Sequence, residues 1–206
     1  MGYSAAMTTV PILGRRDRNK AAKRAAISRA ATELFTQQGY AATTTQQVAR
    51  AADIAEGTLF RYAGSKPELL LMVINEHLRP LVDGVADPSG AAVEDEILHL
   101  LSPIIDLAES QPENAAPFLR EVLFGEDGPQ RREALGLVDQ VVSRIAALLR
   151  PYEDRLEGME PAEAARWVFS ALVSELLQDV VGRGTPDRQA ALRARVRVLL
   201  RGLGAA

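Results

Sequence analysis

The chain has 206 residues, of which 47% are hydrophobic and 25% charged, a balance typical of soluble globular proteins with one or two domains. It contains no cysteine, which excludes disulfides, thiolate metal sites and cysteine nucleophiles and favours the reducing cytoplasm. The start of the chain lacks the pattern of a secretory signal, and no apolar run approaches the roughly 18 residues of a membrane span. We therefore expect a cytoplasmic protein with no membrane partner.

The net charge of −3 is unevenly distributed along the chain. Residues 1–66 carry ten basic and four acidic side chains, a net charge of +6, so the remaining residues must carry −9. A basic segment of this kind favours contact with a polyanion, although a solvated, arginine-rich helix face has the same composition.

Three helices are predicted at the start of the chain. Over residues 19–38 apolar side chains recur at the spacing of one helix face, and Gly39 ends that pattern. A second, short helix follows the threonines at 43–45, and a third spans residues 55–62. Two short helices joined by a sharp turn predict a helix-turn-helix unit, in which the third helix of the chain enters the major groove of DNA.

Six more helices are predicted after these, about nine in all, so the expected fold class is all-α. Ser65 is expected to cap the first of the six. They are expected at residues 65–82, 91–110, 112–125, 129–152, 162–181 and 190–203.

Three runs of residues resemble the amino-terminal signature of the TetR family of bacterial transcriptional regulators. They are GYAATTTQQVA at 39–49, ADIAEGTLFRY at 52–62 and GSKPELL at 64–70. The resemblance covers about the first third of the chain and implies an all-helical protein with a DNA-binding head and a larger body that binds a small molecule and dimerises. The chain then divides into a flexible basic tail (1–18), a helix-turn-helix head (19–66) and a ligand-binding and dimerisation body (67–206).

The chain departs from the family pattern at several positions. Asp53 stands where glycine is usual, and aspartate enters the left-handed backbone region less freely than glycine. Ala55 replaces the usual serine cap of the recognition helix, at a cost of about 1 kcal/mol, so we expect that helix to be loosely held until DNA orders it. Phe60 and Ala63 replace aromatic residues. Glu56 either accepts a hydrogen bond from a cytosine amino group or only favours the start of the helix.

Candidate DNA contacts lie on the second and third helices and at the start of the fourth. Tyr62 and Lys66 are expected to bind phosphate oxygens, and the polar residues before them are expected near base edges. The tail residues Arg15, Arg16 and Arg18 either add affinity for DNA or have no role. The predicted DNA-binding set is Thr44, Thr45, Gln46, Glu56, Gly57, Thr58, Arg61, Tyr62 and Lys66.

The last two helices are the candidates for subunit pairing. Residues 162–181 are apolar on nearly every side, and a helix of that kind is buried on both sides. The family resemblance places a four-helix dimer interface here, and an ordinary monomeric core is the alternative. The predicted interface residues are Val168, Leu172, Leu176, Val180, Leu192, Val196, Leu199 and Leu203.

The body contains few aromatic residues among many aliphatic ones, so a cavity among the fifth to eighth helices would suit a hydrophobic ligand. A closed helical core is the alternative. The predicted lining residues are Phe118, Glu121, Phe124, Trp167 and Phe169.

Other chemistries find little support in the sequence. The two histidines, His77 and His99, fall on different predicted helices, and no phosphate-binding loop motif occurs, so we expect no metal site, cofactor or enzyme activity. The sequence therefore predicts a homodimeric transcriptional repressor that releases a palindromic double-stranded DNA operator when a small hydrophobic molecule binds its body. Two alternatives stay open, a helical small-molecule-binding protein whose head no longer binds DNA and an enzyme built on a helical bundle.

Overall fold

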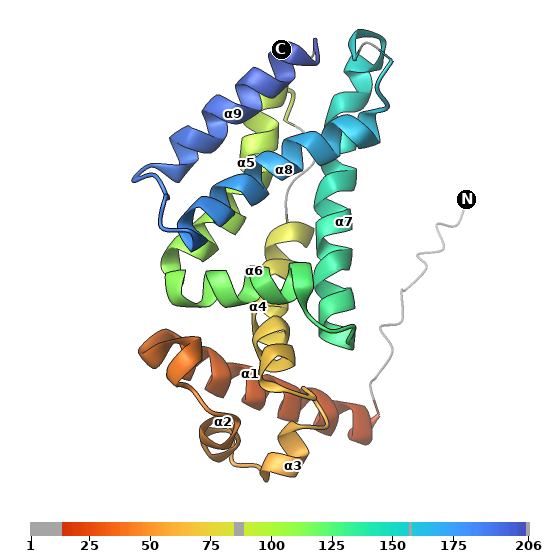
Figure 1. Cartoon of the computed structure of the whole chain (residues 1–206). Helices are drawn as coiled ribbons and strands as arrows, with labels where there is room; N and C mark the ends of the chain where they lie inside the picture. Colours follow the sequence, from red (N-terminus) through yellow and green to blue (C-terminus); the bar gives the residue numbers. More distant parts are fainter. Residues whose placement is uncertain (1–13, 85–88, 157, 205–206) are drawn as a thin grey trace, which may run out of the picture.

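The computed structural model describes residues 14–84, 89–156 and 158–204, and over these residues the chain is all-helical, as predicted. Figure 1 shows a head formed by the first three helices at one end of the molecule, with α4 leading from the head into the body. The elements are α1 (Arg15–Ala42), α2 (Thr45–Ala51), α3 (Glu56–Leu59), α4 (Lys66–Asp83), α5 (Val93–Ser110), α6 (Pro112–Phe124), α7 (Pro129–Leu149), the 3-10 helix η1 (Arg150–Arg155), α8 (Pro161–Val180) and α9 (Arg188–Gly202).

The head differs from its prediction at both ends. Helix α1 begins at Arg15, so Arg15, Arg16 and Arg18 are exposed side chains of a helix and not of a flexible tail. The predicted boundary at residue 18 therefore falls inside α1, while residues 1–13 of the predicted tail lie outside the described residues. Helix α3 has only four residues, and the chain continues from Phe60 to Ala63 as hydrogen-bonded turns.

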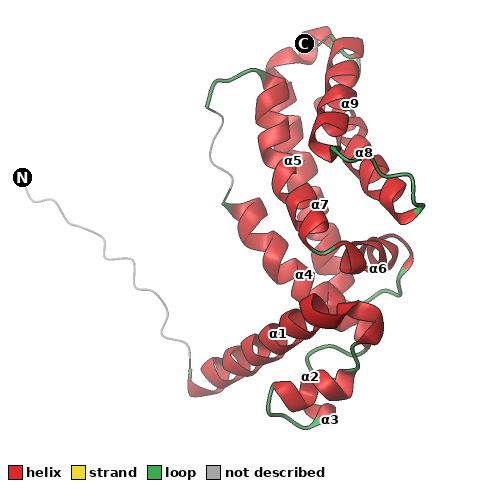
Figure 2. Cartoon of the chain, turned by 90° about the vertical axis from the view of Figure 1, so that its left-hand side faces the viewer, coloured by secondary structure: helices red, strands yellow, loops and turns green. Residues whose placement is uncertain are grey.

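The predicted end of the first helix at Gly39 corresponds to a break inside α1. Gly39 has φ of 76° and ψ of 164°, a backbone conformation that glycine adopts more readily than other residues. A Cβ atom at this position would also collide with the carboxylate of Glu113 in α6. Gly39 therefore lets the end of α1 change direction directly beneath α6, which lies between the head and the rest of the body (Figure 2).

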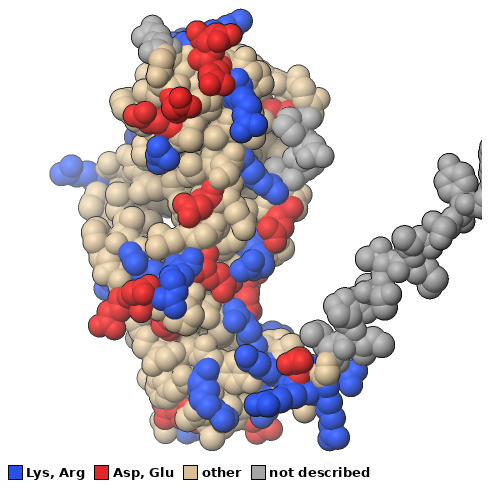
Figure 3. All heavy atoms as spheres, turned by 90° about the vertical axis from the view of Figure 1, so that its right-hand side faces the viewer, with Lys and Arg blue, Asp and Glu red and all other residues tan. Residues whose placement is uncertain are grey.

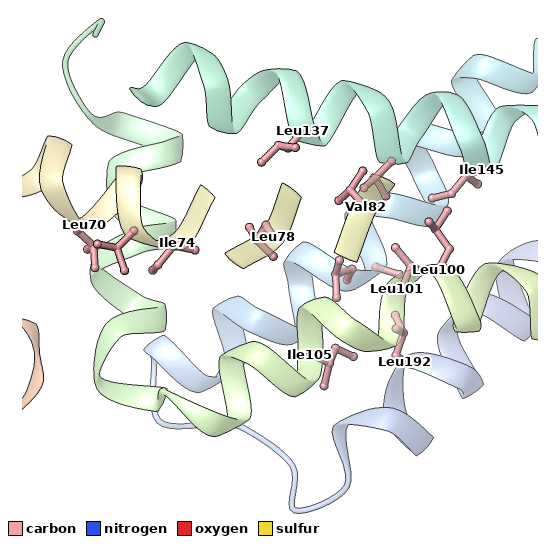
Figure 4. Packing of buried hydrophobic residues seen from close by; sticks show 14 of the residues in the cluster. Leu70, Ile74, Leu78, Val82, Leu100, Leu101, Ile105, Leu137, Ile145 and Leu192 are labelled. Carbon is pink, nitrogen blue, oxygen red and sulfur yellow. The ribbon is translucent and has the colours of Figure 1, made fainter. Parts of the chain in front are cut away.

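The core of the body forms around α4. Its apolar residues recur at i, i+4, i+8 and i+12, and the helix packs against α5, α6 and α7 (Figure 4). Fully burying one such leucine or isoleucine stabilises the fold by about 1.5–3 kcal/mol. The labelled core residues are Leu70, Ile74, Leu78 and Val82 of α4, Leu100, Leu101 and Ile105 of α5, Leu137 and Ile145 of α7, and Leu192 of α9. Because α4 begins in the head at Lys66 and packs along α7, a shift of α4 would move both parts of the molecule.

Within the described ranges, no helix combines the length and the apolar character needed to cross a membrane.

Candidate nucleic-acid interface and body cavity

The helix-turn-helix unit is held together by local polar contacts. Thr44 caps α2, because the Gln47 N–H donates to the Thr44 hydroxyl (3.2 Å) and the Thr44 N–H donates to Gln47 Oε1 (2.8 Å). In the turn, Asp53 has φ of 53°, so it occupies the left-handed region where glycine is usual in the family. Ala55 gives α3 no side-chain cap, as its side chain predicts. Helix α2 is therefore well capped and α3 is not.

Two side-chain hydrogen bonds organise the recognition helix. The Thr45 hydroxyl of α2 donates to Glu56 Oε1 at 2.8 Å, which links the first residues of α2 and α3. Arg61 Nη2 donates to the Thr58 hydroxyl at 3.1 Å. A surface hollow of about 520 Å³ lies between α2 and the start of α3, and its wall includes Gln46 and Glu56. Gln46 and Glu56, two of the residues predicted near base edges, therefore line one hollow on the surface of the head.

Lys66 and Tyr62, the predicted phosphate ligands, lie where the head joins the body. Lys66 Nζ donates to the carbonyl oxygen of Ala41 (3.1 Å) and lies 4.3 Å from the centre of the Tyr40 ring. Burial lowers the pKa of the Lys66 ammonium. Tyr62 is half-buried against the core of the head. Both residues are thus partly engaged within the protein.

The nine predicted DNA-contact residues all lie on or beside α2, α3 and the start of α4. Thr44, Gln46, Gly57 and Arg61 are exposed, and Thr45, Glu56, Thr58, Tyr62 and Lys66 are half-buried. A side chain added at Gly57 would meet no atom within 4 Å, so the α3 backbone is open to solvent at that point. Lysine and arginine side chains gather over the lower end of the molecule, where the head lies (Figure 3). Direct contact of these residues with DNA stays a prediction.

The body contains a cavity of about 550 Å³ between α4, α5, α6, α8 and the loop after α8. Its inner wall is aliphatic and includes Leu78, Ile104 and Leu119. A second cavity of about 150 Å³ extends toward α7. The two cavities share the wall residues Leu78, Ile104, Phe118, Leu119 and Leu176.

One edge of the larger cavity is polar. Arg188 of α9 forms ion pairs with Asp179 and, at 3.4 Å, with Glu109, and both Arg188 and Asp179 line the cavity. The cavity therefore joins a long apolar wall to a compact charged edge, an arrangement that suits an amphipathic molecule.

The predicted cavity lining is partly wrong. Phe118 lines both cavities and Phe169 lines the smaller one. Phe124 is 81% exposed at the end of α6, and Trp167 is 51% exposed on the outer side of α8. Glu121 instead pairs with Arg120 at 2.9 Å, outside both linings. Aromatic content marked the right helices but could not show which face of each helix turns inward.

Asn114 of α6 joins the cavity to the head, and no pattern in the sequence marked this residue. Its side chain is 2% exposed and lines the larger cavity. Its Oδ1 accepts from the Tyr40 N–H (3.0 Å), and its Nδ2 donates to the Phe35 carbonyl (3.4 Å), both in α1. A single asparagine within a helix belongs to no periodic pattern, and its role comes from partners more than seventy residues away.

The predicted dimer residues need a correction. Val168, Leu172, Leu192, Val196 and Leu203 are buried within the protomer's own core, so their side chains do not face a partner. Leu176 and Leu199 are half-buried, and Val180 is 47% exposed. Other apolar residues of these helices and of the turn that follows α8 are exposed instead: Trp167, Leu177, Val181 and Val198. The regular leucine stripe marks the core of the chain's own fold, and the exposed apolar residues lie off that stripe.

Among the described residues, no group of three His, Asp or Glu side chains is arranged to hold a metal ion.

These features define an all-helical protein with a helix-turn-helix head and a hollow body. Residues 27–73 match the model of the bacterial regulatory proteins of the tetR family. Over these residues the resemblance to the TetR family seen in the sequence is therefore confirmed.

Named relatives and solved structures extend the likeness. The chain is 39% identical over 56 residues to the HTH-type transcriptional regulator HbdR of Aromatoleum sp. (strain CIB), a match that covers 27% of this chain and 24% of HbdR. It is 28% identical over 136 residues to the HTH-type transcriptional repressor KstR of Rhodococcus jostii (strain RHA1), covering 65% of this chain and 64% of KstR. These matches span about a quarter and just under two thirds of the two relatives.

The fold resembles that of FadR from Thermus thermophilus, a TetR family transcriptional repressor whose crystal structure contains lauroyl-CoA. The TM-score is 0.67 at 24% identity, over 87% of this chain and 94% of that protein.

Proposed function

We propose that the protein is a DNA-binding transcriptional repressor that releases its operator when a hydrophobic ligand fills the body cavity. The observation that carries this proposal is the combination of an exposed helix-turn-helix head with a cavity of about 550 Å³ whose wall includes a residue bonded to that head. A small-molecule-binding protein without DNA activity would need the cavity but not a contact between the cavity wall and the head.

In this proposal, α3 enters a major groove and the residues predicted from the sequence contact DNA. Gln46, Glu56, Gly57 and Thr58 lie near base edges, since the first residues of a recognition helix reach them. Arg61, Tyr62 and Lys66 contact the backbone, and Thr44 and Thr45 support them from α2. Phosphate would compete with Ala41 and Tyr40 for the Lys66 ammonium, so DNA binding would loosen Lys66 from the end of α1.

The ligand proposed here is a long-chain acyl compound with a polar end. Aliphatic walls favour an unbranched hydrocarbon chain, and the edge formed by Arg188, Asp179 and Glu109 offers donors and acceptors to a polar group. The likeness in fold to a repressor crystallised with lauroyl-CoA supports this class of ligand. Acyl thioesters are therefore the first compounds to test.

Coupling between the two sites would pass through Asn114. A ligand that displaces α6 would pull on the hydrogen bonds from Asn114 to Tyr40 and Phe35, and so move the end of α1. Ligand binding weakens DNA binding only if the ligand prefers the displaced arrangement, and DNA must then weaken ligand binding by the same factor.

We also propose that two subunits pair through the exposed apolar face of α8 and α9, centred on Leu177 and Val198. Trp167, Ser170, Ser174, Leu177 and Val181 alternate by three and four positions, the spacing of a seam between packed helices, and they combine three apolar side chains with two small serines. A twofold axis there would present the two α3 helices to successive major grooves of a palindrome, about 34–36 Å apart.

The test is to recover DNA fragments that the purified full-length protein retains, and then to titrate the enriched DNA with dodecanoyl-CoA. We expect one palindromic motif to be enriched and to be released by the acyl thioester but not by free coenzyme A. If a motif is enriched but dodecanoyl-CoA does not release it, the proposed ligand is wrong. If no DNA is enriched at low salt, the protein is a helical small-molecule-binding protein that does not bind DNA.

A further inference from the structure

The Thr45–Glu56 hydrogen bond fixes the direction and the chemistry of one side chain on the recognition helix. The bond is 2.8 Å long and joins two half-buried side chains that come from different helices. A threonine hydroxyl that donates to a carboxylate occupies one acceptor position of Oε1. The rest of the carboxylate, Oε2 above all, keeps its capacity to accept.

Glu56 is placed where a recognition helix meets base pairs. It is the first residue of α3 and forms part of the wall of the surface hollow that also contains Gln46 and Arg50. In helix-turn-helix complexes the first residues of the recognition helix contact base edges in the major groove. A carboxylate has no proton to donate there at neutral pH, so it requires a donor from the base.

We infer that Glu56 reads the exocyclic amino group of a cytosine at one position of each operator half-site, and that Thr45 is the residue that positions it. This inference rests on the proposed DNA-binding function. Only cytosine and adenine present an amino donor in the major groove. Adenine also presents its N7 acceptor beside the amino group, which repels a carboxylate, and guanine and thymine present acceptors at the corresponding place.

The carboxylate therefore discriminates partly by exclusion. Opposite a base without a suitably placed donor, Glu56 would lose water without gaining a partner and would lie near the negatively charged backbone. A matched pair of this kind typically changes affinity by roughly 5- to 100-fold relative to a mismatched base. The preference for cytosine should thus be visible at a single operator position.

Thr45 acts through Glu56. Without the hydroxyl, the carboxylate gains rotamer freedom and its acceptors are no longer held in one direction. Thr45→Val removes the hydroxyl at nearly constant shape, whereas Thr45→Ser keeps it. Comparison of the two variants separates a positioning role of Thr45 from a packing role, because Thr45→Ser keeps the hydroxyl but lacks the methyl group that packs.

The experiment is a selection of random double-stranded DNA by the full-length protein, followed by sequencing, for the wild type and the three variants Glu56→Gln, Thr45→Val and Thr45→Ser. We expect cytosine at one position of each half-site with the wild type. Glu56→Gln should move the preference at that position alone to adenine, because glutamine pairs with the adenine N6 and N7 atoms. Thr45→Val should weaken the preference at the same position by several-fold, and Thr45→Ser should restore it.

Thermal unfolding and affinity for non-specific DNA at low salt show whether each variant is folded and still binds the backbone. An operator that is unchanged at every position in Glu56→Gln overturns the inference and leaves the proposed function intact. Equal loss of preference at all positions in both Thr45 variants overturns the positioning role. If the wild type enriches no DNA, the proposed function fails, and this inference fails with it.

Discussion

Asp53 and Ala55 show how single residues weaken the turn that orients the recognition helix. Asp53 holds a left-handed conformation, with φ of 53°, that costs a non-glycine residue part of the 1–2 kcal/mol typical of this region. Ala55 leaves the first N–H groups of α3 without a side-chain acceptor. Both departures from the family pattern were visible in the sequence, since turn and cap chemistry is local.

A serine at position 55 should restore the missing cap. We expect Ala55→Ser to increase the free energy of unfolding by about 0.5–1 kcal/mol, because its hydroxyl can accept from a free N–H in the first turn of α3. Urea unfolding of the full chain measures the change. Ala51→Ser, at the exposed last position of α2, is the control and should not stabilise the protein. An unchanged urea midpoint in Ala55→Ser would show that the first N–H groups of α3 already have other hydrogen-bond acceptors.

At the scale of the helices, α6 connects the cavity to α1. Asn114 supplies an acceptor and a donor to the α1 backbone from a position that is 2% exposed. A buried backbone N–H that loses its acceptor costs about 1–3 kcal/mol, so this contact holds the end of α1 in one place.

Replacing Asn114 should uncouple the two helices. We expect Asn114→Ala to destabilise the protein by about 1–3 kcal/mol and to raise hydrogen exchange at the Tyr40 amide, because that N–H loses its acceptor. Exchange measured by mass spectrometry reports both effects. The exposed neighbour Ser110 offers a control, and Ser110→Ala should leave the Tyr40 region protected. Unchanged exchange at Tyr40 in Asn114→Ala would show that another contact holds α1.

Helices α5 and α9 are joined by a pH-dependent contact. Arg197 donates two hydrogen bonds to the Glu94 carboxylate, at 2.8 and 3.0 Å, and Arg193 contacts Glu94 at 3.2 Å and Asp95 at 2.7 Å. The Arg197 hydrogen bond, followed by the arginine charges, lowers the pKa of Glu94 below its ordinary value of 4.5.

The contribution of Glu94 to stability should therefore be lost in acid. Since its pKa is lower in the folded chain than in the unfolded chain, the contribution is complete above the unfolded pKa near 4.5 and disappears as the pH falls through the folded pKa. We expect Glu94→Gln to flatten the fall in the free energy of unfolding as the pH drops below the ordinary pKa of 4.5. Glu153→Gln, at an exposed position in η1, should keep the wild-type profile. If the free energy of unfolding falls with pH in the same way in Glu94→Gln and in the wild type, Glu94 is not the source of the acid sensitivity.

Periodicity, together with cap and turn signals, predicted α1 to α9, because the apolar stripe of each helix faces the shared core, but it did not separate η1 from the end of α7. It could not separate the protomer core from a partner surface. Leu192 and Val196 lie on the most regular stripe of the chain and are fully buried within the subunit, whereas Val198 lies off that stripe and is 68% exposed. The sequence predicted a cavity in the body but not its lining, since the walls combine residues from α4, α5, α6, α8 and α9, whose relative rotation is set only by packing.

At the scale of the whole molecule, the exposed apolar face of α8 and α9 sets the expected assembly. We expect Val198→Glu and Leu177→Glu each to yield a monomer that no longer binds the palindrome tightly, because a charge on this face would be desolvated without a partner. Light scattering measures the mass, and titration of operator DNA measures binding. Phe124→Glu is the matched control, since Phe124 is 81% exposed but lies on α6. If the Val198→Glu protein is still a dimer, the subunits pair through a different surface.

In the proposed function, the wall that the two cavities share would make the response depend on the length of the acyl chain. A short acyl chain would fit in the larger space and leave the common wall of Leu78, Ile104, Phe118, Leu119 and Leu176 undisturbed. A longer chain would have to displace part of that wall to enter the space beside α7. Since Phe118 and Leu119 belong to α6, the helix that holds α1, crossing the wall would itself be the signal. Such a protein would keep its operator in the presence of acyl chains below a threshold length and would release it when longer chains bind.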